Sequence, residues 1–176
     1  MQTQQNRYQQ QRSNKEQHSL RRSLEISPAA YGKVPPQARE LEEAVLGAIL
    51  LEKTAFDEVA DLLRPESFYV DAHKVIYKAA VDLSAKNSPI DILTVAEQLA
   101  KSDDLETIGG VFYLTKLTNS VVSAANIETH ARIIVQKFIQ RELIRVSGEI
   151  IQEAYDAGAD AFDLLDFSEQ KIMEIG

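Results

Sequence analysis

NIETHARIIVQKFIQRELIRVSGEIIQEAYDA, residues 126–157, contains no proline and a single glycine, Gly148. Such an uninterrupted stretch predicts one α-helix of about 30 residues, which at about 1.5 Å per residue extends about 45 Å. The next residues, 157–160, form a tight turn in which Asp160 is suited to cap a following helix, predicted over residues 161–175. Two helices joined by so short a turn form an antiparallel αα-hairpin.

Upstream of this stretch, apolar residues recur at helical spacing in five further segments. These segments are residues 37–51 after Pro35-Pro36, 54–63 with Thr54 as N-cap, 70–86, 92–101 with Asp91 as N-cap, and a helix opened by Gly109-Gly110. Alternating apolar runs between hairpin turns, which would indicate strands, are missing from the sequence. The sequence therefore predicts an all-α fold, with a compact multi-helix globular subdomain over residues 34–120 and a long αα-hairpin over residues 121–176.

The first 33 residues differ from the rest in composition and charge. They are rich in glutamine and poor in apolar side chains, and their six basic residues against two acidic ones give a net charge of +4. Such a segment buries too little apolar surface to offset the entropy lost on ordering, so we expect a disordered basic tail over residues 1–33. The remaining residues carry 13 basic and 25 acidic side chains, so the predicted globular body is strongly acidic.

Composition also excludes several classes of protein. The chain contains no cysteine, which rules out disulfides and thiolate metal sites. No apolar run approaches the roughly 18 residues of a membrane span, and the polar N-terminus is not a signal peptide. An acidic body lacks the basic surface that duplex DNA requires, so we expect little direct DNA binding. These features allow a cytoplasmic location, which we expect for this chain, and we expect no membrane contact.

The predicted long helix carries more apolar surface than one partner helix can cover. One stripe contains Ile127, Ala131, Ile134 and Phe138, and the other contains Val135, Ile139, Leu143, Val146, Ile150 and Ala154. A helix in an isolated hairpin buries one face. The second stripe therefore packs either on the globular subdomain or on a second copy of the chain, and the spacing leaves both alternatives open. Self-association would place Val135, Ile139, Leu143 and Val146 in a dimer interface.

The sequence offers no catalytic, metal-binding or nucleotide-binding residues. The only Gly-Lys pair, Gly32-Lys33, lacks the upstream glycine and the following Ser or Thr of a phosphate-binding P-loop. His18, His73 and His130 have no metal-ligand spacing, and we expect capping or surface roles for His73 and His130. We therefore predict no enzymatic activity and no cofactor for this chain.

Several short segments, taken in order, resemble the N-terminal domain of bacterial replicative DNA helicases of the DnaB family. They are VPP at 34–36, EEAVLGAIL at 42–50, FY at 68–69, HKVIY at 73–77, SPID at 88–91, IGGVFYL at 108–114, SAANI at 123–127, RELI at 141–144 and LLDFSE at 164–169. The chain departs from the family pattern at Ser67, Phe167 and Ser168, and it lacks the ATPase motor that follows this domain in the family. This resemblance leads us to expect a fragment of a larger ATP- and Mg-dependent 5′–3′ helicase.

The resemblance implies roles in assembly and recruitment. Family N-terminal domains pair through their hairpins, form a trimer of dimers above the hexameric motor, and bind the C-terminal domain of primase; a contact with the helicase loader is also implied. On this sequence, the matching primase-contact positions are Tyr113, Ile144 and Ile150, for each of which ordinary packing is the alternative. The implied location is the replisome at the bacterial nucleoid.

Two other functions remain compatible with the same residues. One is a stand-alone helical adaptor or regulator without a motor, which the coding sequence beyond Gly176 would distinguish from a helicase fragment. The other is a DNA-binding helical domain, against which the acidic body argues.

Overall fold

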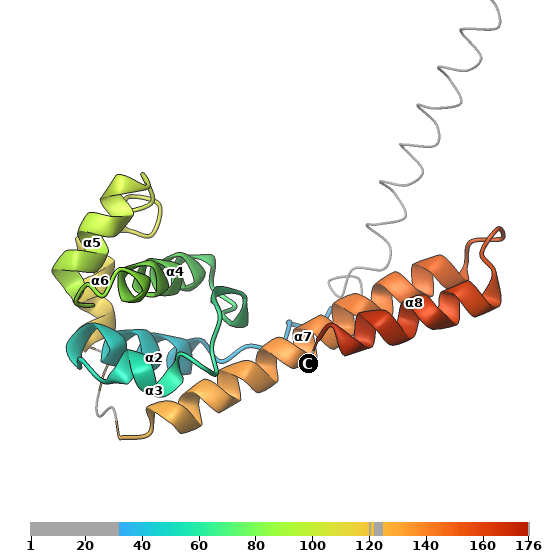
Figure 1. Ribbon diagram of the computed structural model, residues 1–176, viewed down its shortest axis with the longest axis horizontal. Coiled ribbons are helices and arrows are strands. Elements are labelled where there is room, and N and C mark those ends of the chain that lie inside the picture. The colour runs from blue at the N-terminus through green and yellow to red at the C-terminus, as the bar shows by residue number, and fades with distance from the viewer. Residues whose placement is uncertain (1–31, 120, 122–124, 176) are drawn as a thin grey trace, which may run out of the picture. The chain divides into compact units, whose positions relative to one another are not determined.

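The computed structural model describes residues 32–119, 121 and 125–175, and every regular element among them is helical (Figure 1). The α-helices are α2 (Arg39–Leu51), α3 (Ala55–Val59), α4 (Asp71–Ala85), α5 (Ile92–Lys101), α6 (Gly110–Asn119), α7 (Ile127–Ala154) and α8 (Ala161–Met173). One 3₁₀ turn, η2 (Pro65–Ser67), precedes α4. The all-α prediction is confirmed, while the tail predicted over residues 1–33 lies almost wholly outside the described residues.

The chain divides into two compact units within α7. The globular unit is Pro36–Gln140, and residues 141–175 belong to the second unit, the hairpin unit. The sequence placed this division at residues 120–121, but the first half of α7 packs with the globular helices. Its stripe of Ile127, Ala131 and Ile134 is buried in the same hydrophobic core as α2 to α6. The structure thus assigns one of the two apolar stripes to the globular unit.

Helix starts follow the caps that the sequence indicates. The Asp91 carboxylate accepts hydrogen bonds from the Leu93 and Thr94 amides, both at 2.9 Å, and α5 begins at the next residue. Asp160 caps α8 in the same way through the amide of Phe162 at 2.8 Å. These side chains satisfy backbone donors that have no partner within the helix.

The helix predicted over residues 54–63 is shorter than expected. α3 ends at Val59, and the Thr54 side chain makes no capping hydrogen bond. The amides of Leu62 and Leu63 instead donate to the carbonyl of Val59 in a turn, which still buries the Leu63 side chain. Arg64-Pro65 then leads into η2, and the Arg64 guanidinium lies over the Phe138 ring, 4.8 Å from its centroid.

The core of the globular unit forms where α2 packs against α6 and α4. Gly47 of α2 faces the end of α6 so closely that an added Cβ would lie 2.3 Å from the carbonyl oxygen of Leu117. A contact of that length is shorter than any normal van der Waals approach, so the two helices pack closely because residue 47 has no side chain.

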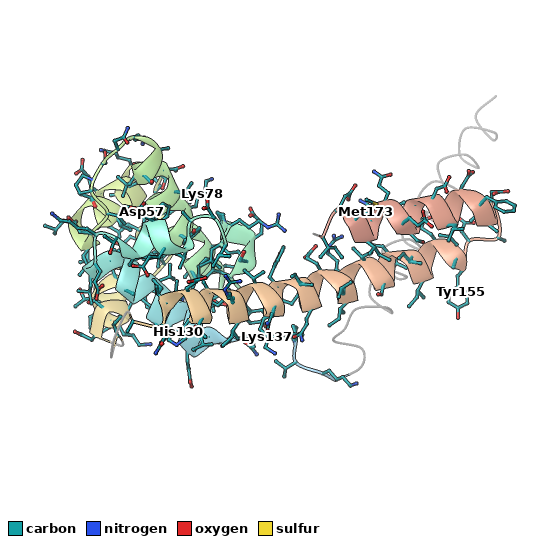
Figure 2. All side chains as sticks on the ribbon, turned by 60° about the horizontal axis from the view of Figure 1, so that its bottom comes forward. Asp57, Lys78, His130, Lys137, Tyr155 and Met173 are labelled. Carbon is teal, nitrogen blue, oxygen red and sulfur yellow. The ribbon has the colours of Figure 1, made fainter. Side chains whose placement is uncertain are left out.

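The hairpin unit contains the end of α7 and the returning helix α8. Tyr155, near the end of α7, points away from α8 (Figure 2) and is exposed. Other large apolar side chains of this unit are also exposed: Leu143, Ile144, Ile151, Phe162, Leu165, Ile172 and Met173. The returning helix therefore leaves apolar surface uncovered in the single chain. Over the described residues, none of the helices combines the length and apolarity needed to cross a membrane.

Candidate docking surfaces and a buried Glu–His–Tyr network

A polar network connects three helices inside the globular unit. Glu42 of α2 and His73 of α4 are 1% and 0% exposed, and Oε2 of Glu42 lies 2.7 Å from Nδ1 of His73. The other ring nitrogen, Nε2, lies 2.8 Å from the hydroxyl of Tyr113 on α6. The Glu42 carboxylate also accepts hydrogen bonds from the backbone amides of Tyr69 at 2.8 Å and Val70 at 3.3 Å.

The Glu42 carboxylate is held in its ionised form. Burial alone raises its pKa, but the hydrogen bonds from His73 and from the Tyr69 and Val70 amides outweigh burial, and its pKa lies below the ordinary value of 4.5. An ionised carboxylate only accepts hydrogen bonds, so Nδ1 of His73 must carry a proton and its N–H donates a hydrogen bond to Glu42. The proton positions at Nε2 and at the Tyr113 hydroxyl can then adjust to each other, since a hydroxyl both donates and accepts.

The burial of Glu42 and His73 fits a structural role for this network. A substrate would have to reach side chains that are almost completely covered, and only Tyr113 extends to the surface. The described residues contain no group of three or more His, Cys, Asp or Glu side chains placed to hold a metal ion. The expected capping or surface role of His73 is wrong, because His73 lies on the inward face of α4 beside Ile76 and Tyr77.

The sequence carries one signal for this network. Glu42 stands in register with Val45, Leu46 and Ile49, so an acidic residue falls within the apolar stripe of its helix. A charged residue at such a position needs a buried partner. The partner of Glu42, His73, lies on another helix. Spacing along the chain does not identify such a tertiary contact.

Tyr113 lies half-buried at the edge of this network. Its ring stacks on the His73 imidazole with centroids 6.1 Å apart, and Nζ of Lys116 lies 5.7 Å from its centroid. Burial and the nearby charges of Glu43 and Glu42 raise the pKa of the Tyr113 phenol, which keeps it protonated. The preceding residue, Phe112, is 82% exposed, so an exposed aromatic side chain and a fixed one stand together at the start of α6.

The residues predicted for the dimer interface differ in accessibility. Ile139 is 36% and Leu143 is 43% exposed, whereas Val135 is half-buried and packs against the globular core. Val146 is only 1% exposed in the single chain. Any apolar interface along this stripe of α7 therefore centres on Ile139 and Leu143.

The predicted primase-contact residues fall in different units. Tyr113 belongs to the globular unit, where its hydroxyl faces His73, and Ile144 and Ile150 belong to the hairpin unit. Ile144 is exposed and Ile150 is half-buried. Both side chains therefore remain accessible to a partner.

Solved structures define the class to which this fold belongs. The N-terminal domain of DnaB helicase from Mycobacterium tuberculosis superposes with a TM-score of 0.76 at 36% identity, over 80% of this chain and 99% of that one. A structure of a DnaB-like replicative helicase and its interactions with primase superposes over 78% of this chain and 30% of that one, with a TM-score of 0.66 at 29% identity. The fold is thus that of a helicase N-terminal helical domain.

Sequence comparisons agree with this class. The chain is 47% identical over 144 residues to the replicative DNA helicase DnaB of Rhodothermus marinus and 42% identical over 143 residues to that of Geobacillus stearothermophilus. These matches cover 82% and 81% of this chain but 15% and 32% of the relatives, so the chain spans a third or less of their length. Residues 34–136 match the DnaB-like helicase N terminal domain, and the chain belongs to that family.

Proposed function

We propose that this chain is the non-catalytic N-terminal part of a replicative DNA helicase, in which it supports assembly of the ring and docks primase. The observation that carries the proposal is the apolar surface left exposed on the hairpin unit of a chain that belongs to this family. Exposed apolar side chains clustered on one element are typical of a protein–protein contact. In this proposal, ATP hydrolysis, DNA translocation and any Mg-dependent step belong to a motor domain of the parent helicase.

Assembly is proposed to begin with pairing of two copies of α7 through Ile139, near the end of the globular unit, and Leu143, in the hairpin unit. These side chains stand four residues apart on α7 and share a face of the helix. Covering them against a second copy would remove apolar surface from water at about 25 cal/mol per Å². Three such dimers would form the trimer of dimers in the ring of the full-length helicase. The helicase loader would be a further partner of the same assembly.

A charge placed in this interface should separate the dimer. We expect Leu143→Asp or Ile139→Asp to weaken self-association at least about thirtyfold, since an unpaired carboxylate would be buried where an apolar contact stood. Sedimentation equilibrium from micromolar to millimolar chain concentration measures the change. Gln140→Asp is the matched control, because it adds the same charge at an exposed, already polar position of α7. A parent chain that stays monomeric over the whole range would contradict the pairing.

Recruitment is proposed to use apolar side chains of both units. We expect Tyr113→Ala and Ile144→Ala each to weaken binding of the primase C-terminal domain by at least about fivefold, because truncating a well-packed anchor costs about 1 kcal/mol or more. Ile150→Ala should have a smaller effect, since Ile150 is less exposed than Ile144. Calorimetry on variants that keep the parent's helicity and oligomeric state measures these changes.

One result would contradict the proposed docking site, and another would contradict primase as the partner. Unchanged affinity in all three folded variants would move the docking site elsewhere on the domain. A parent chain that does not bind primase, alone or within the complete helicase, would remove primase as the partner. The acidic body favours this protein partner over DNA, and the parent complex would act in the replisome at the bacterial nucleoid.

A further inference from the structure

Glu42 and His73 are buried polar side chains in a unit whose other buried residues are mostly hydrophobic. Replacing a buried ion pair by apolar residues of similar volume is often neutral or stabilising, so a buried pair is weak evidence for a role in stability. The directed geometry of this pair is its distinctive property. Its hydrogen bonds run from α2 through α4 and end at one hydroxyl on α6, that of Tyr113.

Each hydrogen bond in the series restricts the next side chain. The amides of Tyr69 and Val70 orient the Glu42 carboxylate, and the carboxylate orients the imidazole of His73 through Nδ1. With Nδ1 occupied, the second ring nitrogen of His73 can point in only one direction, toward the Tyr113 hydroxyl at 2.8 Å. The position of a surface residue is thus determined by two side chains that no partner can touch.

The start of α6 is restricted from the other side as well. Gly109 has a φ of +100°, and a Cβ added there would lie 3.3 Å from Cβ of Tyr113. The absence of that atom lets the chain turn into α6 with Tyr113 packed inward and Phe112 directed outward, 82% exposed. The turn and the hydrogen bond together hold two adjacent aromatic residues in different environments.

We propose that Glu42 and His73 are positioning residues that hold Tyr113 in one orientation, so that the first turn of α6 is a preformed contact surface for primase. The partner in this inference rests on the proposed function, whereas the hydrogen bond itself can be tested without a partner. Preformed surfaces bind more tightly because less conformational entropy is lost when the complex forms. Loss of the hydrogen bond should therefore reduce affinity while the fold is kept.

The test uses four variants of the full chain that differ in which hydrogen bond they can keep. His73→Asn keeps a group near Nδ1 for Glu42 and loses the contact with Tyr113, while His73→Gln places a donor and acceptor near Nε2. Tyr113→Phe removes only the hydroxyl, and the fourth variant combines His73→Asn with Tyr113→Phe. The first readout is the ¹³Cζ resonance of Tyr113, assigned by its absence in Tyr113→Phe, and the second is calorimetric affinity for the primase C-terminal domain.

The positioning role predicts a specific pattern across these variants. The Tyr113 resonance should move in His73→Asn and return toward the parent value in His73→Gln. Tyr113→Phe and His73→Asn should each weaken primase binding about three- to tenfold, the range expected for one hydrogen bond. The double variant should be no weaker than the weaker single variant, because both changes remove the same interaction. His73→Gln should recover only part of the affinity lost in His73→Asn, because it restores a contact with Tyr113 but lacks the Nδ1 hydrogen bond by which Glu42 orients residue 73.

Other patterns overturn the inference. An unmoved Tyr113 resonance in folded His73→Asn would mean that His73 does not hold the hydroxyl. A moved resonance with unchanged affinity, or additive losses in the double variant, would mean that primase binding does not use the positioned ring. A parent chain without affinity for primase would contradict the proposed partner and the docking half of the inference, while the resonance would still decide the positioning half.

Discussion

Glu42→Ala should destabilise the globular unit by about 3 kcal/mol or more, because three hydrogen-bond donors inside the protein lose their acceptor and each such loss costs about 1–3 kcal/mol. The carboxylate is 1% exposed and accepts hydrogen bonds from one imidazole and two backbone amides. Truncation removes all three acceptor contacts at once and leaves the Nδ1 proton of His73 facing a void. Urea denaturation followed by circular dichroism measures the loss as a lower midpoint with an unchanged slope.

The adjacent residue provides the matched control. Glu43 has the same side chain one position along α2, but its nearest cation is Lys116 at 3.9 Å and both side chains are partly exposed. Partly exposed ion pairs contribute about 0–1 kcal/mol, so Glu43→Ala should change stability by less than about 1 kcal/mol. If Glu42→Ala and Glu43→Ala lowered the free energy of unfolding equally, the buried network would contribute no more to stability than the partly exposed ion pair.

The same carboxylate should make the stability of the protein depend on acid. Because the folded-state pKa of Glu42 is below its ordinary value of 4.5, the unfolded chain takes up the proton first as pH falls. The stabilisation by Glu42 is therefore complete above pH 4.5 and is lost as pH falls below 4.5 through the lowered folded-state value. Glu42→Gln should be less stable than the parent at neutral pH, and the difference should shrink in acid.

Gly47→Ala should also be strongly destabilising, by about 3 kcal/mol, at the upper end of the range for overpacking. The new Cβ would lie 2.3 Å from the carbonyl oxygen of Leu117 and 2.5 Å from a methyl group of Val121. The Leu117 oxygen is a backbone atom in α6, so the clash is relieved only by moving that helix away from α2. Alanine's better helix propensity, worth about 1 kcal/mol, offsets only part of this cost.

Gly158→Ala is the control for this substitution. An added Cβ at Gly158 would lie 3.6 Å from the nearest atom, an Asp156 carboxylate oxygen, which is ordinary contact. We expect a change within about 0.5 kcal/mol, as for most surface substitutions. Thermal and urea unfolding of both variants gives the comparison, and a Gly47→Ala protein as stable as the parent would show that α2 and α6 separate freely.

The long helix α7 shows what helical periodicity predicts and what it leaves open. The two stripes on α7, the helix starts after Asp91 and Asp160, and the all-α class all follow from spacings of one to four residues, which are local properties of a helix. Helical spacing alone left open whether the second stripe packs on the globular subdomain or on a second copy of the chain. The structure buries Ile127, Ala131 and Ile134 in the globular core and leaves Ile139 and Leu143 exposed.

By itself, the sequence determined the all-α class, the caps at Asp91 and Asp160, and a family resemblance that the comparisons confirmed, because each of these depends on residues close in the chain or on their order. Only the tertiary structure decided that Glu42, His73 and Tyr113 form one network, since their partners are 31 and 40 residues apart along the chain. The same holds for Gly47, whose missing side chain matters because of the Leu117 carbonyl on another helix. Helical spacing determines which face of a helix is buried, but the group that meets that face depends on how the helices pack.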